Sequence, residues 1–355
     1  MKMHDILVEA VNNGSSDVFI VGGLPLTYKI HGQQQRMTEQ GDLMPRQTEE
    51  LIFQLYDIAH RDYNKIRNED TDDDFSVALD GIGRFRVNAF HQRGSLAAVV
   101  RVIRFGIPRY QDLDIPEEVM SVTRFHQGVV LVTGQVGAGK STTLACIVDA
   151  INQSRTGHIL TLEDPIEYVH SHSKCIVSQR EVFSDCTGYL PALRSALRES
   201  PDVILLGEMR DYETIDVAMK AAETGQLLLS SLHTSSAAST VDRIIDTFPA
   251  NQQAQIRLQL SMVLQAVISQ QLVPDVDGKL IPVFEIMFAN PAIRNLIRES
   301  KTHQMDAAIQ AGAAQGMRTM DGSLLTLYRK GRITKDTVMR CCLNYEATSR
   351  KLSLL

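Results

Sequence analysis

The stretch GQVGAGKSTTL, residues 134–144, decides the fold of this 355-residue chain. It fits the pattern G-x-x-x-x-G-K-[ST] through four residues: Gly134, Gly139, Lys140 and Ser141. An apolar run with strand character, GVVLVTG, precedes the pattern, and a segment with helical period, KSTTLACIVDAIN, follows it. A chance glycine turn does not explain this strand–loop–helix order. The sequence therefore predicts a phosphate-binding loop and a bound nucleoside triphosphate.

The loop suits phosphate binding because its backbone N–H groups, and those of the helix that it opens, face the phosphates. In this pattern the lysine bridges the terminal phosphates and the serine hydroxyl ligates Mg²⁺. We expect the nucleotide to contact the loop and the first turn of the helix: Gly134, Val136, Gly137, Ala138, Gly139, Lys140, Ser141 and Thr142.

Four apolar runs indicate the architecture from Gly128 onward: GVVLVTG, HILTLED, DVILLGE and LLLSSLH. Segments with helical period separate these runs. Strands that are buried on both faces and alternate with helices form a parallel sheet with right-handed crossovers. We therefore predict an α/β domain over residues 128–355, with a mostly helical part after about residue 250.

The N-terminal part has a different pattern. Short apolar stretches between residues 5 and 104 alternate with turn signals, which favours antiparallel strands, and residues 45–66 predict one amphipathic helix. We read the acidic run NEDTDDDF (68–75) as a solvated loop. Residues 1–104 thus predict a small α+β domain, and residues 105–127, which contain two prolines and little periodicity, predict a linker.

Composition limits the class of protein. The net charge is −6, which argues against a bulk electrostatic grip on nucleic acid or on an anionic membrane. The five cysteines have no metal-site or disulfide spacing and fit a reducing cytoplasm. Neither a signal peptide nor a run of roughly 18 apolar residues is evident, so we expect a soluble protein that meets membranes only through partners.

Two carboxylates end predicted strands, at the edge where an open α/β sheet binds ligands: Glu163 and Glu208. Either one is able to polarise a water molecule against the γ-phosphate, and the alternative is that each caps the next helix. Gly207 stands where a magnesium-side Asp is usual. His233, at the end of another strand, is a candidate γ-phosphate sensor or subunit contact, with a purely structural role as the alternative.

Five arginines lie close together in the N-terminal part: Arg84, Arg86, Arg93, Arg101 and Arg104. Guanidinium groups aimed across a domain cleft would neutralise charge that develops on the γ-phosphate. A solvated sheet face explains the same residues equally well.

Several motifs together resemble the superfamily of type IV pilus and type II secretion ATPases, and within it the pilus-retraction ATPases. Beside the phosphate loop they are FRVNAFHQRG (85–94), LEDPIEYVH (162–170), LRESPDVILLGEMRD (197–211), HTSSAASTVDRIIDTFP (233–249) and AIRNLIRE (292–299). The last motif is similar to a segment associated with retraction rather than assembly. The resemblance spans nearly the whole chain.

The resemblance implies a PAS-like N-terminal domain and a RecA-like ATPase domain that assemble as a hexamer. ATP would lie between the two domains, with Arg86, Arg93, Arg101 and Arg104 reaching the phosphates. Glu208 would be the catalytic carboxylate, Glu163 its companion in placing water and Mg²⁺, and His233 part of the γ-phosphate sensor. The implied function is an ATP-driven motor for pilus retraction, in the cytoplasm at the inner face of the membrane, that acts on an inner-membrane platform protein.

Two residues depart from the family pattern. Gln135 stands where proline is common, which a backbone-cradling loop tolerates. Gln226 replaces the first histidine of the family's His box, and an amide can hydrogen-bond but cannot titrate. This second departure is compatible with an accessory paralogue.

Rival functions fit the sequence less well. A pilus-assembly or secretion ATPase has the same architecture, but AIRNLIRE and the absence of a tetracysteine zinc site weigh against the assembly enzymes. A nucleic-acid motor lacks support because the chain is acidic and has no stretch in which basic and aromatic residues interleave. A small GTPase is weaker still, because no NKxD-like motif follows the loop.

Overall fold

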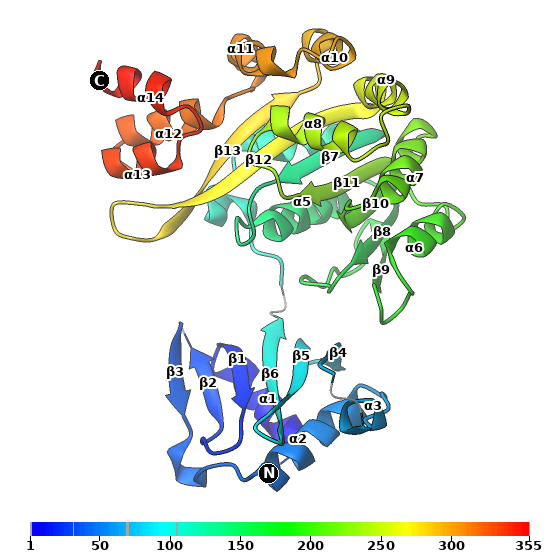
Figure 1. The fold of residues 1–355 in the computed structure, drawn as a ribbon, viewed down its shortest axis with the longest axis vertical. Coiled ribbons are helices and arrows are strands. Elements are labelled where there is room, and N and C mark those ends of the chain that lie inside the picture. Colours follow the sequence, from blue (N-terminus) through cyan, green and yellow to red (C-terminus); the bar gives the residue numbers. More distant parts are fainter. Residues whose placement is uncertain (1, 31, 69–70, 104–105, 355) are drawn as a thin grey trace. The chain divides into compact units, whose positions relative to one another are not determined.

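The computed structural model describes residues 2–30, 32–68, 71–103 and 106–354. The chain divides into two compact units (Figure 1). The first is Met1–Gly106 with Glu167–Val169, and the second is Ile107–Ile166 with His170–Leu355.

The N-terminal unit contains an antiparallel sheet in the strand order β3-β2-β1-β6-β5-β4. Its strands are β1 (Ser15–Ile20), β2 (Thr27–Ile30), β3 (Gln33–Arg36), β4 (Asp73–Leu79), β5 (Gly83–Gln92) and β6 (Ser95–Ile103). Its helices are α1 (Met3–Asn12), α2 (Pro45–Ile58), α3 (Asn64–Asn68) and the 3-10 turn η1 (Thr38–Gln40).

Buried and more exposed side chains alternate along the strands of this unit, as predicted. On β5, Phe85 and Val87 are buried while Arg84 and Arg86 are only half-buried. The buried residues of the sheet share one apolar core with α1 and α2. One face of the sheet is therefore closed by helices, and the other carries polar side chains.

Two local predictions in this unit are wrong. The helix predicted over residues 45–66 ends at Ile58, and His60 has a φ of 53° in the left-handed region, which an α-helix cannot continue through. The acidic run is a loop only in part, because β4 begins at Asp73. The Asp73 side chain is buried and accepts a hydrogen bond of 2.9 Å from the hydroxyl of Tyr56 and one of 3.2 Å from Arg61. These donors compensate the buried carboxylate.

The second unit contains a mixed sheet in the order β13-β12-β7-β11-β10-β8-β9. All neighbours pair in parallel except β13, which is antiparallel to β12. The strands are β7 (Gly128–Thr133), β8 (Gly157–Glu163), β9 (Cys175–Glu181), β10 (Val203–Glu208), β11 (Leu227–Leu232), β12 (Leu264–Pro274) and β13 (Leu280–Phe288).

Helices cover both faces of this sheet. They are α4 (Glu117–Met120), α5 (Lys140–Ser154), α6 (Tyr189–Ala196), α7 (Tyr212–Glu223), α8 (Ala237–Asp246), α9 (Gln253–Val263), α10 (Pro291–Arg298), α11 (Met305–Ala311), α12 (Met320–Arg329), α13 (Lys335–Cys341) and α14 (Tyr345–Leu352). Short 3-10 turns are η2 (Tyr110–Leu113), η3 (Ser121–Arg124), η4 (Thr302–Gln304) and η5 (Ala313–Gln315).

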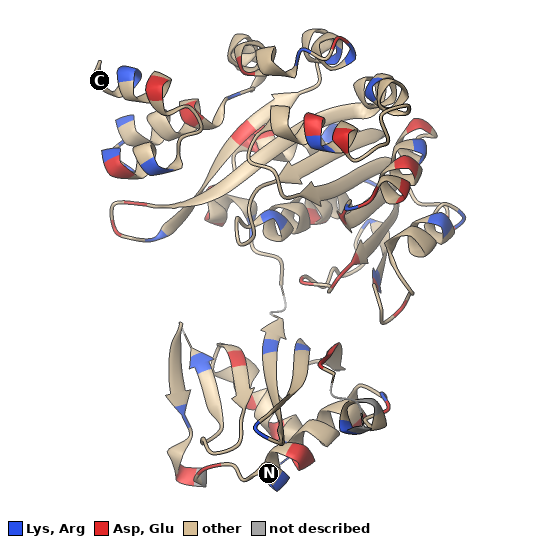
Figure 2. Ribbon diagram, viewed as in Figure 1, with Lys and Arg blue, Asp and Glu red and all other residues tan. Residues whose placement is uncertain are grey.

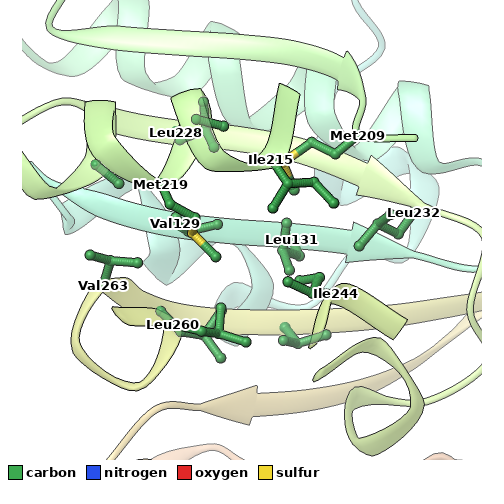
Figure 3. Packing of buried hydrophobic residues seen from close by; sticks show 14 of the residues in the cluster. Val129, Leu131, Met209, Ile215, Met219, Leu228, Leu232, Ile244, Leu260 and Val263 are labelled. Atoms are coloured by element: carbon green, nitrogen blue, oxygen red, sulfur yellow. The ribbon is translucent and has the colours of Figure 1, made fainter. Parts of the chain in front are cut away.

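Strand β7 shows how the two faces are filled. Val129 and Leu131 point into a core formed with α7, α8 and α9 (Figure 3). Val130 and Val132 point to the other face, into a core that includes α5. Burial on both faces explains why these strands read as continuous apolar runs. The predicted α/β fold with a parallel sheet and a separate antiparallel N-terminal sheet is confirmed.

The prediction of a mostly helical part after residue 250 is wrong for residues 264–288, which form β12 and β13. Their apolar runs are buried on both faces and therefore carry no period that separates strand from helix. The turn between the two strands carried a usable signal. Asp275 Oδ1 accepts the backbone N–H of Asp277 and of Lys279, at 2.9 and 2.8 Å, in an Asp-Val-Asp-Gly turn. Helices α12, α13 and α14 pack against this hairpin.

Residues 107–127 differ from the predicted linker. They contain η2, α4 and η3, and four of their side chains are buried in the core beside α5: Ile115, Val119, Met120 and Val122. The two prolines that suggested a linker lie outside these short helices, at positions 108 and 116. Among the residues with a described position, no helix is both long and apolar enough to cross a bilayer.

Candidate nucleotide-binding site

The loop between β7 and α5 has the backbone that its glycines predict. Gly134, Gly137 and Gly139 have φ values of 151°, 79° and 85°, in the region that side chains rarely adopt. A Cβ atom on Gly134 would also lie 2.2 Å from the carbonyl oxygen of Gln270 on β12. The turn is therefore possible only with glycine at its first position.

Lys140, the first residue of α5, turns its side chain back into the loop. It is 8% exposed, and its Nζ donates to the carbonyl oxygens of Gly134 at 2.9 Å and Gln135 at 3.0 Å. Nζ also lies 3.4 Å from Nδ1 of His233, which follows β11. The loop thus holds a buried ammonium group by its own carbonyls.

His233 connects this ammonium group to Glu208 at the end of β10. An ammonium group only donates, so Nδ1 of His233 is the acceptor in this contact. Nε2 lies 3.6 Å from Oε2 of Glu208, and the other carboxylate oxygen pairs with Arg210. The hydrogen bond to Glu208 raises the pKa of Arg210. Lys140, His233, Glu208 and Arg210 therefore form one continuous polar chain.

Glu163, at the end of β8, lies beside this chain because β8 and β10 are neighbours. Its Oε1 accepts a hydrogen bond of 3.3 Å from Gln179. Between the two strand ends sits the phenol of Tyr189. Burial raises the pKa of this phenol, and the charges of Asp164, Glu208 and Glu163 raise it further. The acidic side chains predicted from the sequence are thus gathered around one hydroxyl group.

The missing Asp at position 207 has a packing cause. A Cβ atom on Gly207 would lie 2.9 Å from the Tyr189 hydroxyl and 3.2 Å from the carbonyl oxygen of Leu162. The strand also bulges here, since Leu206 pairs with Ser230 while Glu208 pairs with Ser231. The bulge places Glu208 at the end of the strand. A larger residue at position 207 would require the Tyr189 hydroxyl and the Leu162 carbonyl to move.

The donor set suits Mg²⁺ only when a nucleotide is present. The hydroxyl of Ser141 is exposed at the start of α5, and Glu163 and Glu208 supply oxygens, which Mg²⁺ prefers. In the described ranges no cluster of three His, Cys, Asp or Glu residues forms a cation site of its own. Phosphate oxygens would have to complete the coordination.

The comparisons with known proteins agree with this geometry. A family model described as "Type II/IV secretion system protein" matches residues 1–315. This chain belongs to the type II/IV secretion system protein family. The motif resemblance predicted from the sequence is confirmed.

Three relatives illustrate the similarity. The chain is 45% identical over 336 residues to the "Type IV pilus retractation ATPase PilT" of Pseudomonas aeruginosa, which covers 95% of this chain and 96% of that one. It is 39% identical over 341 residues to the "Type IV pilus ATPase PilU" of the same organism, covering 96% and 88%. The fold is similar to a crystal structure of the pilus retraction motor PilT with bound ADP, with a TM-score of 0.90, 42% identity and 99% of each chain covered.

The AIRNLIRE motif of this family member is helix α10. Ile293 and Ile297 are buried in the core, while the guanidinium of Arg294 donates to the carbonyl oxygens of Ser261 and Met262, both at 2.7 Å. These carbonyls lie at the C-terminal end of α9, where cations stabilise a helix. Arg294 therefore joins α10 to α9. The exposed residues of α10 are Pro291, Ala292, Asn295 and Arg298.

Gln226 lies far from the phosphate loop within this unit. It precedes β11, and its carbonyl accepts from Gly128 at the start of β7. The loop begins where β7 ends, so one strand length of ~20 Å separates them. The amide of Gln226 accepts a hydrogen bond from Thr224. Its replacement of histidine leaves the polar chain from Lys140 to Arg210 intact.

Three of the predicted arginines, Arg84, Arg86 and Arg101, lie on the face of the N-terminal sheet opposite the helices. Arg86 and Arg101 are directly paired neighbours on β5 and β6. Arg86 donates to Asp74 through Nε and one terminal nitrogen, and Arg101 donates to Asp17 at 3.1 Å. Figure 2 shows basic and acidic positions distributed over the strands of this sheet.

The other three predicted arginines have fewer described contacts or lie outside the described residues. Arg93 is exposed in the turn between β5 and β6, with a φ of 47°. Arg84 lies on the same strand face as Arg86. Arg104 lies outside the described residues.

Gln270 on β12, which packs against the loop, was not identified by sequence spacing. Its side chain is 4% exposed, and Oε1 accepts a hydrogen bond of 2.7 Å from the buried hydroxyl of Thr143 on α5. Its Nε2 would lie 2.9 Å from a Cβ atom on Gly139. A paired-strand prediction for residues 264–274 would have placed this residue beside the loop.

Replacing Gln270 by leucine tests this contact. The variant leaves the Thr143 hydroxyl buried without its acceptor, a loss of ~1–3 kcal/mol. We expect a fluorescent ATP analogue to bind about tenfold more weakly in an equilibrium titration.

The neighbouring Gln271 is a matched control. Its amide donates to the carbonyl of Cys341 instead of reaching α5. Gln271→Leu should bind the same analogue within about twofold of the unaltered chain. Equal weakening in both variants would show that the effect does not come from the loop.

Proposed function

We propose that this chain is an ATPase motor that hydrolyses ATP to drive type IV pilus retraction and twitching motility. The observation that carries the proposal is the polar chain at the phosphate loop, in a protein that is 45% identical to a pilus retraction ATPase along nearly its whole length. In this proposal the phosphate loop binds the nucleotide, and the strand-end carboxylates activate the attacking water. The assignment to pilus retraction comes from the similarity to the retraction ATPase.

Nucleotide binding begins with an exchange of partners at Lys140. Its ammonium group leaves the carbonyl oxygens of Gly134 and Gln135 and binds the terminal phosphates, whose charge is a stronger acceptor. The N–H groups at the start of α5 bind the same phosphates. Ser141 and Glu163 would hold Mg²⁺, which would neutralise negative charge on the terminal phosphates.

Glu208 orients the attacking water and takes its proton. The carboxylate lies within 3.6 Å of His233, whose other nitrogen lies 3.4 Å from Lys140 Nζ. A phosphate at Lys140 therefore changes the hydrogen bonding of His233 and, through it, the position of Glu208. In this way His233 reports the presence of the γ-phosphate to the catalytic carboxylate.

The nucleoside occupies the cavity of about 480 Å³ beside the first turn of α5. Its lining includes Thr142, Thr143, Gln270, Leu272 and Ile281. This volume suits a nucleotide-sized ligand, and the apolar strand residues offer a surface for the base. Another cavity of about 580 Å³, between β13 and α12, contains no residue of the loop.

The arginines of the N-terminal sheet supply further positive charge to the phosphates in this proposal. We expect Arg86→Ala and Arg101→Ala to slow ATP hydrolysis by about tenfold or more while binding changes little. Arg46 on α2, which pairs with the exposed Glu50, is the matched control. Unchanged turnover in both sheet variants, measured by phosphate release, would leave these arginines as a solvated face.

Two further parts of the proposal concern assembly. The chain works as a homo-hexamer in the cytoplasm, at the inner face of the membrane, and acts on an inner-membrane platform protein of the pilus machine. The absence of a membrane-spanning helix in the described residues is consistent with contact through such a partner. Hydrolysis would change the angle between the two units and so produce mechanical work.

The catalytic assignment is tested by two variants. Lys140→Ala should abolish binding of ATP because the loop loses its cation. Glu208→Gln should keep binding but lose about 10²–10⁴-fold in turnover, the usual contribution of a general base. A Glu208→Gln protein that releases phosphate at the normal rate would remove Glu208 from catalysis, and tight binding by Lys140→Ala would place the nucleotide elsewhere.

An accessory pilus ATPase is the second candidate function, favoured by Gln226, which replaces the first histidine of the family's His box. Deletion of the gene in its host separates the candidates when surface pili are counted. A retraction motor leaves an excess of immobile pili, and an accessory ATPase leaves pilus numbers near normal. Bald cells would indicate assembly instead and contradict the proposal.

A further inference from the structure

Glu285, in the middle of β13, is a buried carboxylate that the nucleotide site does not use. It is 1% exposed, and its two oxygens accept hydrogen bonds from the backbone of two different helices. Oε1 accepts from Ala237 at 2.6 Å, and Oε2 accepts from Met320 at 3.2 Å. Ala237 and Met320 are the first residues of α8 and α12.

Glu285 thus bridges the starts of α8 and α12, and α8 follows directly in the chain from the nucleotide site. Only residues 233–236 connect the end of β11 to α8, and His233 is the first of them. Ser236 caps the helix by accepting the N–H of Ser239, and Glu285 holds the next backbone N–H. The far end of the His233 loop is therefore fixed by two adjacent anchors.

The helix on the other side leads to the C-terminal helices. Helix α12 packs with α13 and α14 on the hairpin of β12 and β13. Met320 lines a cavity of about 450 Å³ together with Gly134, Val136, Ser235 and Arg340. The C-terminal helices thus face the phosphate loop across this cavity, and Glu285 fixes where the first of them begins.

The bridge is electrostatically unusual. Within the ranges that the structure describes, no Lys, Arg or His pairs with Glu285, so the two N–H groups and the positive ends of two helix dipoles stabilise its charge. The pKa of Glu285 is raised to about 7: burial is the largest cause, the N–H groups of Ala237 and Met320 lower the pKa, and the carboxylates Asp306 on α11 and Asp321 on α12 raise it. Ionisation strengthens both hydrogen bonds, because N–H groups bind a carboxylate more strongly than a neutral acid.

We propose that Glu285 is a positioning residue that couples the C-terminal helices to the His233 loop, so that the start of α12 helps to set the geometry of the catalytic centre. This coupling rests on the proposed ATPase function. It predicts that a change at the start of α12, which is not among the lining residues of the proposed nucleoside cavity, alters turnover without altering nucleotide binding.

The amide variant Glu285→Gln tests the coupling first. Its oxygen is expected to keep the shorter bond to Ala237, while its NH₂ group faces the N–H of Met320 and cannot accept from it. We expect kcat for ATP hydrolysis to fall about threefold to tenfold while KM stays within about twofold, because the phosphate loop is untouched.

A second pair of variants isolates the remote bond and remains informative if Glu285→Gln does not fold. Met320→Pro removes the backbone donor at the first position of α12, where proline is tolerated. Thr319 before it has φ −78° and ψ 157°, which proline also permits. Met320→Ala shortens the same side chain but keeps the donor. The coupling predicts a clearly lower kcat for Met320→Pro than for Met320→Ala.

The pH dependence of kcat distinguishes the proposed coupling from a purely structural role of Glu285. Because the carboxyl ionises near pH 7 in the folded protein, the ratio of kcat for the unaltered chain to kcat for Glu285→Gln should rise between pH 6 and 8. Stability changes in the opposite direction. Because the pKa of Glu285 is higher in the folded state than in the unfolded state, folding becomes less favourable as the pH rises toward 7. The melting temperature of the unaltered chain should therefore fall between pH 6 and 8 more than that of Glu285→Gln.

The outcomes separate the two proposals. An unaltered chain that does not hydrolyse ATP contradicts the proposed function itself. If it does hydrolyse ATP, equal kcat in Met320→Pro and Met320→Ala overturns the coupling alone. A ratio of kcat values that stays constant from pH 6 to 8 overturns it as well.

Discussion

A buried ammonium group is the constraint on which the nucleotide site depends. Lys140 Nζ is enclosed by the loop, and a charge in such a place requires partners. Its partners are two carbonyl oxygens of the loop and the ring of His233, so the shape of the loop and the end of β11 are fixed together. Any phosphate that takes over this cation must also change what His233 contacts, and His233 faces Glu208.

The parallel sheet makes this arrangement possible because it brings the carboxyl ends of β7, β8, β10 and β11 to one edge. The contributions of the neighbouring strands are less visible in the sequence. Gln270 on β12 accepts a hydrogen bond from Thr143 on α5 beside the loop. The hydroxyl of Tyr189 on α6 occupies the space where a side chain at position 207 would lie. The site is thus held by packing from strands and helices that carry none of its predicted chemistry.

Much of this was predictable from local pattern. The phosphate loop, the four apolar strands and the strand-end residues Glu163, Glu208 and His233 follow from spacing, because a glycine turn and a buried strand each impose a strict local requirement. The hairpin of β12 and β13 was missed because its apolar runs lack a period. Gln270 and Glu285 were missed with it, since their roles come from non-local contacts that sequence spacing does not encode.

The most direct test of the account is a structure of the protein with a non-hydrolysable ATP analogue and Mg²⁺. The account predicts that Lys140 Nζ leaves the carbonyl oxygens of Gly134 and Gln135 for the terminal phosphate, with Glu208 facing that phosphate. A terminal phosphate bound away from Lys140, with the ammonium group still on the loop carbonyls, would contradict it.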